Sequence, residues 1–291
     1  MPGSRGIFST TPASRILSPD QFSLMKTKSI NEGIGGAYER IAYSNAIKRI
    51  AKENNCHSIL ELGATFIAGL PGFNSCLLAQ DGFDVTVTVH SRDYIETLEA
   101  WENVDFGKKT RILKWDRNLK TEFKDNQFDL VWNHLAFEHY RHPEKLVEEM
   151  KRISNNVVIN FTLSPWNIGF SLHWLAHKLQ GKKWDHGYFK NTLISTMEKT
   201  HEEAGLTIIE SGGCDDPPWM DTVDAQMGGT MTYFDYAPKF LKNNWIWNSA
   251  LPECQNHWLV KLLWDWEKNF PEWFRRSTAH HLYTASQKKK I

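Results

Sequence analysis

The stretch that decides the fold runs from Phe128 to Ile153 and reads FDLVWNHLAFEHYRHPEKLVEEMKRI. It begins with a short apolar run, Phe128 to Trp132, and continues into a segment with helical spacing. Pro143 stands where the first residue of a helix would stand, and the apolar residues after it fall on one helical face: Leu146, Val147, Met150 and Ile153. The stretch therefore predicts a strand that leads into a crossover helix.

Similar short apolar runs recur on both sides of this unit, and helix-length segments separate most of them. The runs are Ser58 to Leu62, Val85 to Val89, Arg111 to Leu113, Val157 to Phe161 and Leu206 to Ile209. Ser44 to Glu53 is expected to form a helix before the first strand. This alternation favours an α/β fold with a mostly parallel sheet and helices on both faces.

Composition and charge restrict the class of protein. The chain has 291 residues, of which 41% are apolar and 23% charged, which is enough for a sizeable core. Its 34 basic and 34 acidic residues cancel, so no nucleic-acid partner is expected. No apolar run approaches the roughly 20 residues that span a bilayer, and no signal peptide is evident, so a cytoplasmic protein is expected. The four cysteines show no C-x-x-C pairing and suggest neither a zinc knuckle nor a disulfide framework.

Four parts are expected along the chain: an N-terminal arm at 1–40, a core at 41–213, a helical aromatic insertion at 214–272, and the last strand with a basic tail at 273–291. Within the insertion, an amphipathic helix through Trp258 and Trp266 should end before Pro271. The insertion can act as a lid over an apolar substrate, as an extra helical layer, or, with weaker support, as a membrane-surface face. Its tryptophans include Trp219, Trp245, Trp247, Trp258, Trp264 and Trp266.

Glu61 and Gly63 close the first apolar run. A nucleotide-binding turn needs such a glycine, because glycine lets the backbone turn tightly and approach a ligand closely. Taken alone, the pair is common in α/β proteins.

The motifs in their order resemble the class I S-adenosylmethionine (SAM)-dependent methyltransferase family, in particular the group called type 11. ILELG at 59–63 resembles its first motif, and Phe128 to Ile153 resembles its fourth strand and following helix. Trp115-Asp116-Arg117 lies where the acidic motif of the third strand belongs. HGYF at 186–189, EAGL at 203–206 and AHHLYTASQK at 279–288 resemble the segments around the sixth and the last, antiparallel strand. The resemblance implies a Rossmann-like methyltransferase sheet and SAM as the cofactor.

The resemblance also implies a role for particular residues in holding the cofactor. The methionine and ribose portion would lie on the first motif, the ribose near His90, the adenine amino group near Asp116, and the sulfonium above Asn133. The first-motif residues are Glu61, Gly63, Ala64 and Gly72. Asp116 can also be a strand-end turn residue, and Asn133 a cap.

Two features depart from the family pattern. The loop ATFIAGLPG separates Gly63 from Gly72 and is longer than the compact family loop. His90 stands where the family has an acid that grips the ribose, and Asp93 follows three residues later as a possible substitute.

His139, Glu138 and His186 are the candidates to remove a proton from the methyl acceptor. Methyl transfer is an in-line displacement, so alignment supplies much of the rate and only a protonated nucleophile needs a base. His139 can equally fix its loop within the core. A metal at His134, His139 and His142 is not favoured, because the resemblance accounts for His139 without one, and no metal site is expected.

The leading hypothesis is methyl transfer from SAM to an oxygen, nitrogen or carbon of a small or lipid-like acceptor. The alternative is a catalytically inactive module that binds a protein partner through the Trp-rich region at 214–272. Aminopropyl transfer is a further hypothesis for the same pocket, but the acidic cluster that a polyamine substrate would need is not evident in the sequence. Neither the acceptor nor the oligomeric state follows from the sequence.

Overall fold

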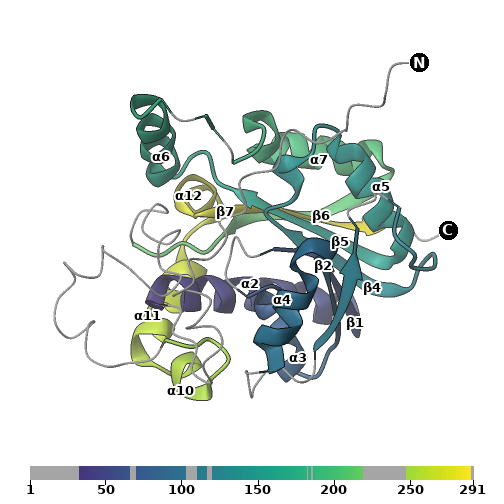
Figure 1. Cartoon of the computed structure of the whole chain (residues 1–291). Helices are drawn as coiled ribbons and strands as arrows, with labels where there is room; N and C mark the ends of the chain where they lie inside the picture. The colour runs from purple at the N-terminus through teal and green to yellow at the C-terminus, as the bar shows by residue number, and fades with distance from the viewer. Residues whose placement is uncertain are drawn as a thin grey trace.

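The fold is a seven-stranded sheet with helices on both faces, seen in a computed structural model (Figure 1). The structure describes residues 33–65, 70–102, 110–116, 120–181, 183–184, 186–218 and 247–289. The strand order is β3-β2-β1-β4-β5-β7-β6. The strands are β1 (Ser58–Ala64), β2 (Asp84–His90), β3 (Thr110–Trp115), β4 (Phe128–His134), β5 (Ser154–Leu163), β6 (Leu206–Cys214) and β7 (His281–Lys288).

The strand directions confirm the predicted sheet. Neighbouring strands from β3 to β5 pair in parallel, whereas β7 is inserted between β5 and β6 and is antiparallel to both. This is the Rossmann-like methyltransferase fold. The strand order reverses between β1 and β4, which creates a switch point at the carboxyl ends of these strands, where ligands bind in open α/β sheets. We call the side of the sheet that holds these ends the carboxyl edge.

Two hydrophobic layers follow from the alternation of side chains along the strands. Ile59, Leu130 and Trp132 face the helices α2, α3 and α4, whereas Leu60 and Val131 face α5 and α7. The helices around the sheet are α2 (Gly33–Glu53), α3 (Phe73–Gln80), α4 (Ser91–Glu102), α5 (Pro143–Ile153), α6 (Ile168–Leu179) and α7 (Ile194–Glu203). Two short 3-10 helices, η2 (Phe137–His139) and η3 (Phe189–Thr192), lie close together.

Helix α5 confirms the interpretation of the opening stretch. Pro143 occupies its first turn, and the predicted apolar face is buried: Leu146, Val147, Met150 and Ile153. Helix α2 differs from its prediction because it begins at Gly33 rather than near Ser44, so the expected boundary at residue 40 falls inside it. Its first turns bury Ile34 and Tyr38 in the core, and this tertiary burial stabilises a glycine-rich helix start that its own sequence would not favour.

The described part of the aromatic insertion packs as an extra helical layer. Its helices are α10 (Pro252–Gln255) and α11 (Trp258–Asn269), and α12 (Glu272–Thr278) follows. Helix α11 ends before Pro271 as predicted, and its buried Glu267 accepts a hydrogen bond of 2.6 Å from Tyr38 Oη on α2. Trp219 and Trp245 lie outside the described residues. Whether the insertion at 214–272 acts as a lid over an apolar substrate therefore stays a prediction.

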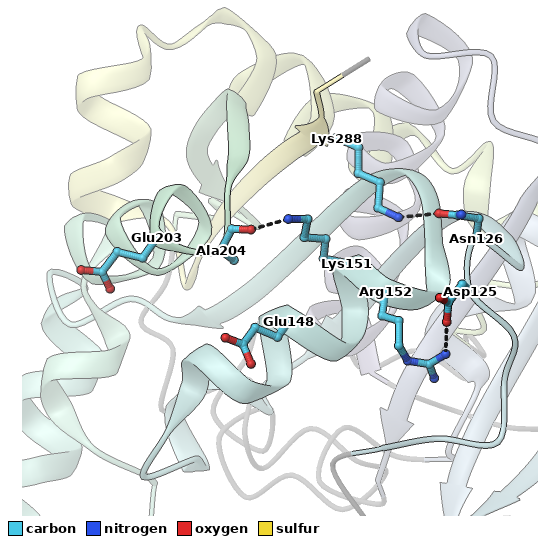
Figure 2. Close-up of a pocket in the computed structure, with 8 residues that line it drawn as sticks. All are labelled: Asp125, Asn126, Glu148, Lys151, Arg152, Glu203, Ala204 and Lys288. Atoms are coloured by element: carbon cyan, nitrogen blue, oxygen red, sulfur yellow. Dashed lines mark hydrogen bonds and ion pairs between the residues drawn. The ribbon is translucent and has the colours of Figure 1, made fainter. Parts of the chain in front are cut away.

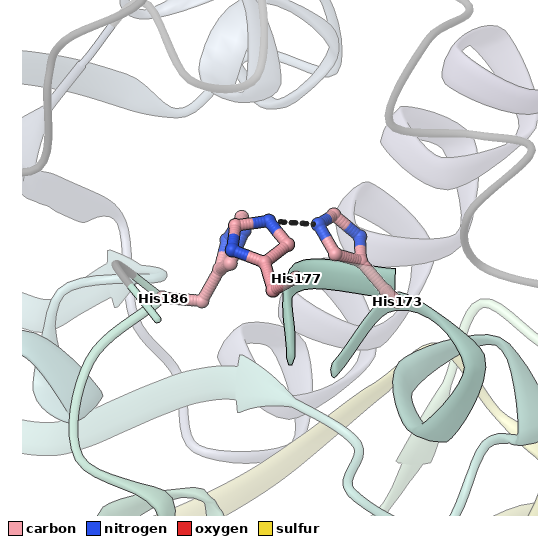
Figure 3. Close-up of side chains that lie close together, drawn as sticks. All are labelled: His173, His177 and His186. Atoms are coloured by element: carbon pink, nitrogen blue, oxygen red, sulfur yellow. Dashed lines mark hydrogen bonds between the residues drawn. The ribbon is translucent and has the colours of Figure 1, made fainter. Parts of the chain in front are cut away.

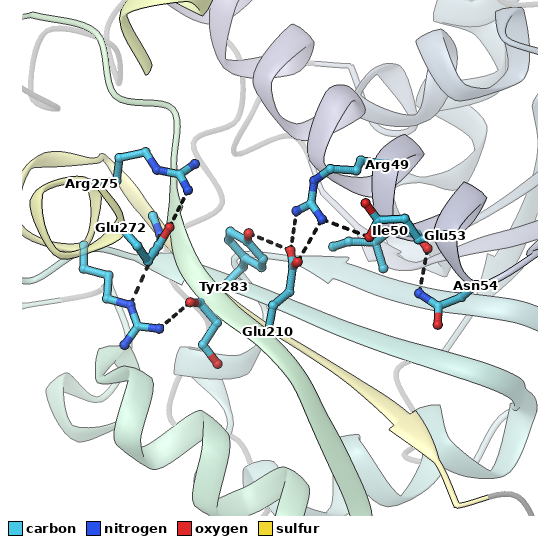
Figure 4. Close-up of polar contacts among 11 residues, drawn as sticks. Arg49, Ile50, Glu53, Asn54, Glu210, Glu272, Arg275 and Tyr283 are labelled. Carbon is cyan, nitrogen blue, oxygen red and sulfur yellow. Dashed lines mark hydrogen bonds and ion pairs between the residues drawn. The ribbon is translucent and has the colours of Figure 1, made fainter. Parts of the chain in front are cut away.

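Polar contacts fasten α2 and α12 to strand β6 (Figure 4). Arg49 of α2 donates to both carboxylate oxygens of Glu210 on β6, one bond measuring 2.8 Å, and Tyr283 Oη donates to the same carboxylate at 2.7 Å. Glu272 of α12 accepts the Gly213 amide at 3.0 Å. Helices α2 and α12, which are distant in sequence, are thereby held on β6, which Tyr283 joins to β7. No helix in the described part of the chain is both long and apolar enough to cross a membrane.

Candidate cofactor and acceptor site

Glu61 lies under the switch point with only 1% of its surface exposed. Its Oε2 accepts a hydrogen bond of 2.6 Å from Ser75 Oγ on α3. Burial raises the pKa of Glu61 to about 7, although the Ser75 hydrogen bond and the charge of Arg40 oppose this shift. The side chain therefore links β1 to the helix that follows the cofactor loop.

Gly63 forms the turn that the sequence singled out. Its φ is +81°, and its amide donates to Thr88 Oγ1 at 2.8 Å. A Cβ at this position would lie 2.6 Å from the Trp115 ring, so both the dihedral angle and the space require glycine. Ala64 is buried beside it, and Gly72 stands directly before α3. Residues 66–69 between them lie outside the described residues.

His90 and Asp93 are positioned at the end of β2, where the ribose is expected. His90 Nδ1 accepts the Arg92 amide at 3.0 Å, which assigns the proton of the neutral ring to Nε2. Nε2 can then donate to a ribose hydroxyl but not accept from it. Asp93 is 8% exposed, and its Oδ1 accepts a hydrogen bond of 3.0 Å from Arg92 Nε. The nearby acid is thus engaged with Arg92.

Asp116 follows β3 at the carboxyl edge and is exposed. Its carboxylate lies 3.9 Å from Lys114 Nζ, a solvated ion pair that leaves the carboxylate accessible. An exposed acceptor next to the strand end fits the amino group of an adenine.

Asn133 is fully buried near the end of β4. Its Nδ2 lies 3.2 Å from Met150 Sδ, so the amide is directed into the layer between β4 and α5. Its Oδ1 has no hydrogen-bond partner among the residues that the structure describes. A buried acceptor without a partner is costly, which marks this residue as a candidate for function.

Glu138 lies in η2 just beyond the end of β4 and is 0% exposed. Within the described ranges, neither carboxylate oxygen has a hydrogen bond of ordinary geometry. Burial raises the pKa of Glu138 to about 7, although nearby backbone amides and the Thr162 hydroxyl oppose this shift. Its carbonyl accepts the Tyr188 amide at 2.7 Å, and a Cβ on Gly187 would lie 2.5 Å from the same oxygen. The segment around Gly187 therefore covers Glu138 closely.

The three predicted bases are only partly brought together. His139 is half-buried directly after Glu138 in η2. His186 precedes the Gly187 segment, but its ring packs against His173 and Trp184, with centroid distances of 4.6 and 4.7 Å. The backbone of the 186–188 segment thus meets Glu138, while the His186 ring joins a different cluster.

Sequence reasoning missed a buried polar network at the same edge. His134 Nε2 at the end of β4 lies 2.8 Å from Tyr43 Oη and 3.3 Å from Glu39 Oε1, both on α2. His281 at the start of β7 lies near this group and near Asp215, at 3.6 Å. Burial opposes ionisation of Glu39, but the His134 hydrogen bond and the charge of His281 lower its pKa. The two adjacent histidines in AHHLYTA indicate polar residues at the start of the last strand. The sequence gives no sign that Glu39, within the predicted arm at 1–40, reaches them.

A charged cavity of about 400 Å³ lies at the opposite edge of the sheet (Figure 2). Its basic side chains already have partners: Lys151 Nζ donates to the Ala204 carbonyl at 2.6 Å, and Arg152 pairs with Asp125 at 2.6 Å. Lys288 Nζ likewise donates to Asn126 Oδ1. The charged residues of this cavity therefore serve to join α5, α7 and β7 to their neighbours. The carboxyl edge is the candidate functional site.

Comparison with known proteins gives one family match. Residues 67–156 match the family model described as a methyltransferase domain. No curated protein matches the chain.

Solved structures of methyltransferases are similar at low identity. A SAM-dependent methyltransferase from Aquifex aeolicus is 19% identical, covering 57% of this chain and 82% of its own, with a TM-score of 0.40. A SAM-dependent methyltransferase from Thermotoga maritima is 11% identical, covering 87% of this chain and 91% of its own, with a TM-score of 0.48. Because both scores are below 0.5, the assignment rests on the matched segment and on the strand order.

The residues at the carboxyl edge fit SAM. Gly63 gives the close backbone turn, Asp116 an exposed acceptor and His90 a donor, whereas the Asn133 side chain is buried against α5. Residues 67–156 thus match a methyltransferase domain, the strand order is that of the Rossmann-like methyltransferase fold, and S-adenosylmethionine is the cofactor of such a domain.

Proposed function

We propose that this chain transfers a methyl group to an oxygen, nitrogen or carbon of a small or lipid-like acceptor. The acceptor binds at the carboxyl edge, beside η2 and the segment around Gly187. Bound SAM supplies a methyl group made electrophilic by its sulfonium. The residues of this chain align the acceptor and, where the nucleophile is protonated, remove its proton.

The observation that carries this proposal is the environment of Glu138. Its carboxylate is fully buried, lacks hydrogen bonds of ordinary geometry to the described residues, and has its pKa raised by burial to about 7. Groups with such pKa values serve as acids or bases near neutral pH, and their burial is a cost that functional sites tolerate. Glu138 is therefore the first candidate base. His139, the next residue in η2, is the second, and His186 stays a prediction.

Helix α6 favours an apolar acceptor. It follows β5 at the carboxyl edge and stands apart from the sheet (Figure 1). Its exposed face carries Ile168, 64% exposed, Leu172, Leu175 and Leu179, 78% exposed, at helical spacing. An exposed apolar row of this kind is typical of a surface that binds an apolar ligand or a lipid interface. The exposed apolar row on α6 therefore favours a lipid-like acceptor over a small polar one.

The test is to supply the full-length protein with SAM labelled at the methyl group and with fractionated cell extract. We expect label in a small-molecule or lipid fraction. Glu138→Gln should lower the rate by roughly 100-fold or more while changing SAM affinity less than about twofold, because a base contributes to the reaction and not to cofactor binding. An unchanged rate in this variant would remove Glu138 from the mechanism.

The second candidate function is a catalytically inactive module that binds a protein partner. It is favoured by a row of exposed residues on α11, one helical turn apart: Trp258, Leu262 and Trp266, which are 60%, 55% and 44% exposed. This function predicts a folded protein that transfers no label to any fraction. Trp258→Ser and Trp266→Ser would then weaken a purified partner complex, whereas the enzyme hypothesis requires transfer activity in the parent chain.

A further inference from the structure

Three histidines converge beside helix α6, which follows β5 in the chain (Figure 3). His173 and His177 lie one turn apart on α6, and His186 lies on the chain that returns toward η3. One ring nitrogen from each histidine lies within 4.8 Å of the others. The Nε2 atoms of His173 and His177 are 2.9 Å apart. All three side chains are half-buried.

The local sequence explains this convergence. Residues four apart on a helix share one face, which puts the His173 and His177 rings side by side. Trp184 packs against all three imidazoles, with centroid distances of 5.9, 5.5 and 4.7 Å to His173, His177 and His186. The indole thus forms one wall of the cluster and holds His186 against α6.

A hydrogen bond orients the central imidazole. His177 Nδ1 lies 3.2 Å from the Lys183 carbonyl, which can only accept, so this ring carries its proton on Nδ1. The lone pair of His177 is then on Nε2 and faces Nε2 of His173. Histidine ligands of metals characteristically donate their other ring N–H to a backbone carbonyl in this way.

We propose that His173, His177 and His186 bind a divalent transition-metal ion of the zinc class. Zinc bonds to imidazole nitrogens at about 2.0–2.1 Å, which puts two nitrogens of a tetrahedral site about 3.3 Å apart. The Nε2 atoms of His173 and His177, 2.9 Å apart, are slightly closer than this, and the His186 nitrogen lies within 4.8 Å of the other two ligand nitrogens, so small ring rotations would complete the site. Three imidazoles leave the fourth position for water or for a donor atom of a ligand.

This site differs from the histidine set weighed in the sequence. Within the described ranges, His142 pairs with Glu144 on the surface and His134 is buried beside Tyr43. The described residues group neither of them with His139 as metal ligands.

The metal would fix the segment that covers Glu138. His186 is two residues from Tyr188, whose amide donates to the Glu138 carbonyl. A bound ion would therefore join α6 to the Gly187 segment beside the proposed acceptor site. Metal binding itself does not depend on methyl transfer.

The experiment is a metal titration of the chelator-treated full-length protein. Zinc affinity is measured by competition with a chromogenic chelator, and Co²⁺ is added separately to record its visible absorption, which is intense for tetrahedral coordination. We expect one ion per chain. His177→Ala should weaken zinc binding by at least about 100-fold and abolish the Co²⁺ bands, because a ligand is lost.

His142→Ala is the matched control, since His142 is exposed and outside the cluster, and it should bind like the parent. His173→Gln is a second cluster variant that keeps the size of the side chain if His177→Ala folds poorly by circular dichroism. Equal zinc affinity in the parent and in a folded cluster variant would show an adventitious ion only and overturn the site. SAM binding, measured separately by calorimetry, distinguishes failure of the methyltransferase proposal from failure of the metal site.

Discussion

The two halves of the carboxyl edge are built differently. On the side of β1, β2 and β3, the site depends on backbone geometry, above all the φ of +81° at Gly63 and its contact with Trp115. On the side of β4 and β5, it depends on buried ionisable groups such as Glu138. We call these the cofactor half and the acceptor half. Substitutions in the cofactor half should therefore act by changing the shape of the backbone. Substitutions in the acceptor half should act by changing the protonation of buried groups.

The largest expected effect is in the cofactor half. Gly63→Ala should weaken SAM binding by more than about 100-fold and destabilise the protein by about 2–4 kcal/mol, because it adds left-handed strain and a clash with Trp115. Calorimetry and urea unfolding measure the two effects.

Gly82→Ala is the matched control for this variant. Gly82 has a φ of +95°, but a Cβ there would meet nothing within 4 Å. Gly82→Ala should lower the free energy of unfolding only by the left-handed strain, about 1–2 kcal/mol, and should leave SAM affinity unchanged. Equal effects of the two variants would contradict the importance of the contact at Gly63. Gly63→Arg would meet the same contact and should reduce both folding stability and cofactor binding.

The next effect tests the acceptor half through pH. The pKa of Glu138 is raised from its ordinary value of 4.5 to about 7, so its stabilising contribution is complete below pH 4.5 and is lost as pH rises through 7. Glu138→Gln removes this dependence. Relative to the parent, the variant should gain as much as about 3 kcal/mol of unfolding free energy between pH 5 and pH 8.5.

Urea unfolding at these two pH values checks the prediction. Glu148→Gln is the control, because Glu148 is an exposed glutamate on α5, the helix that follows η2. Glu61, whose pKa is also raised to about 7, is present in both proteins and cancels in the comparison. A variant-to-parent difference that stays constant with pH would show that Glu138 does not titrate in this range.

The smallest effect returns to the cofactor half. Asp116→Ala should weaken SAM binding by about fivefold, since an exposed hydrogen bond contributes about 1 kcal/mol. Asp84→Ala serves as the control, because Asp84 is an exposed acid at the opposite end of β2. If both variants bind SAM like the parent, Asp116 does not hold the adenine.

The two halves also differ in how well the sequence predicted them. The strands, α5 and the Gly63 turn follow local patterns, and local periodicity is visible in one sequence. The start of α2 at Gly33 was missed, because its stability comes from burying Ile34 and Tyr38 against distant strands. The sequence offered Glu138 only as a candidate base, and its burial, which raises its pKa, comes from packing that includes the segment around Gly187.

Side-chain clusters that join distant segments were beyond sequence reasoning. The group of Glu39, His134 and His281 joins α2, β4 and β7, and nothing in the local spacing of these residues indicates that they meet. The same holds for His186, which was predicted to be a base and whose ring lies beside His173 and His177. Only the packing of α6 and Trp184 brings these imidazoles together.

The most direct test of the central claim is calorimetric titration of the full-length protein with SAM and with S-adenosylhomocysteine. We expect saturable binding of one cofactor per chain at roughly micromolar concentration, retained in Gly82→Ala and lost in Gly63→Ala. Absence of binding heat for both compounds, in parent protein shown by circular dichroism to be folded, would contradict the account.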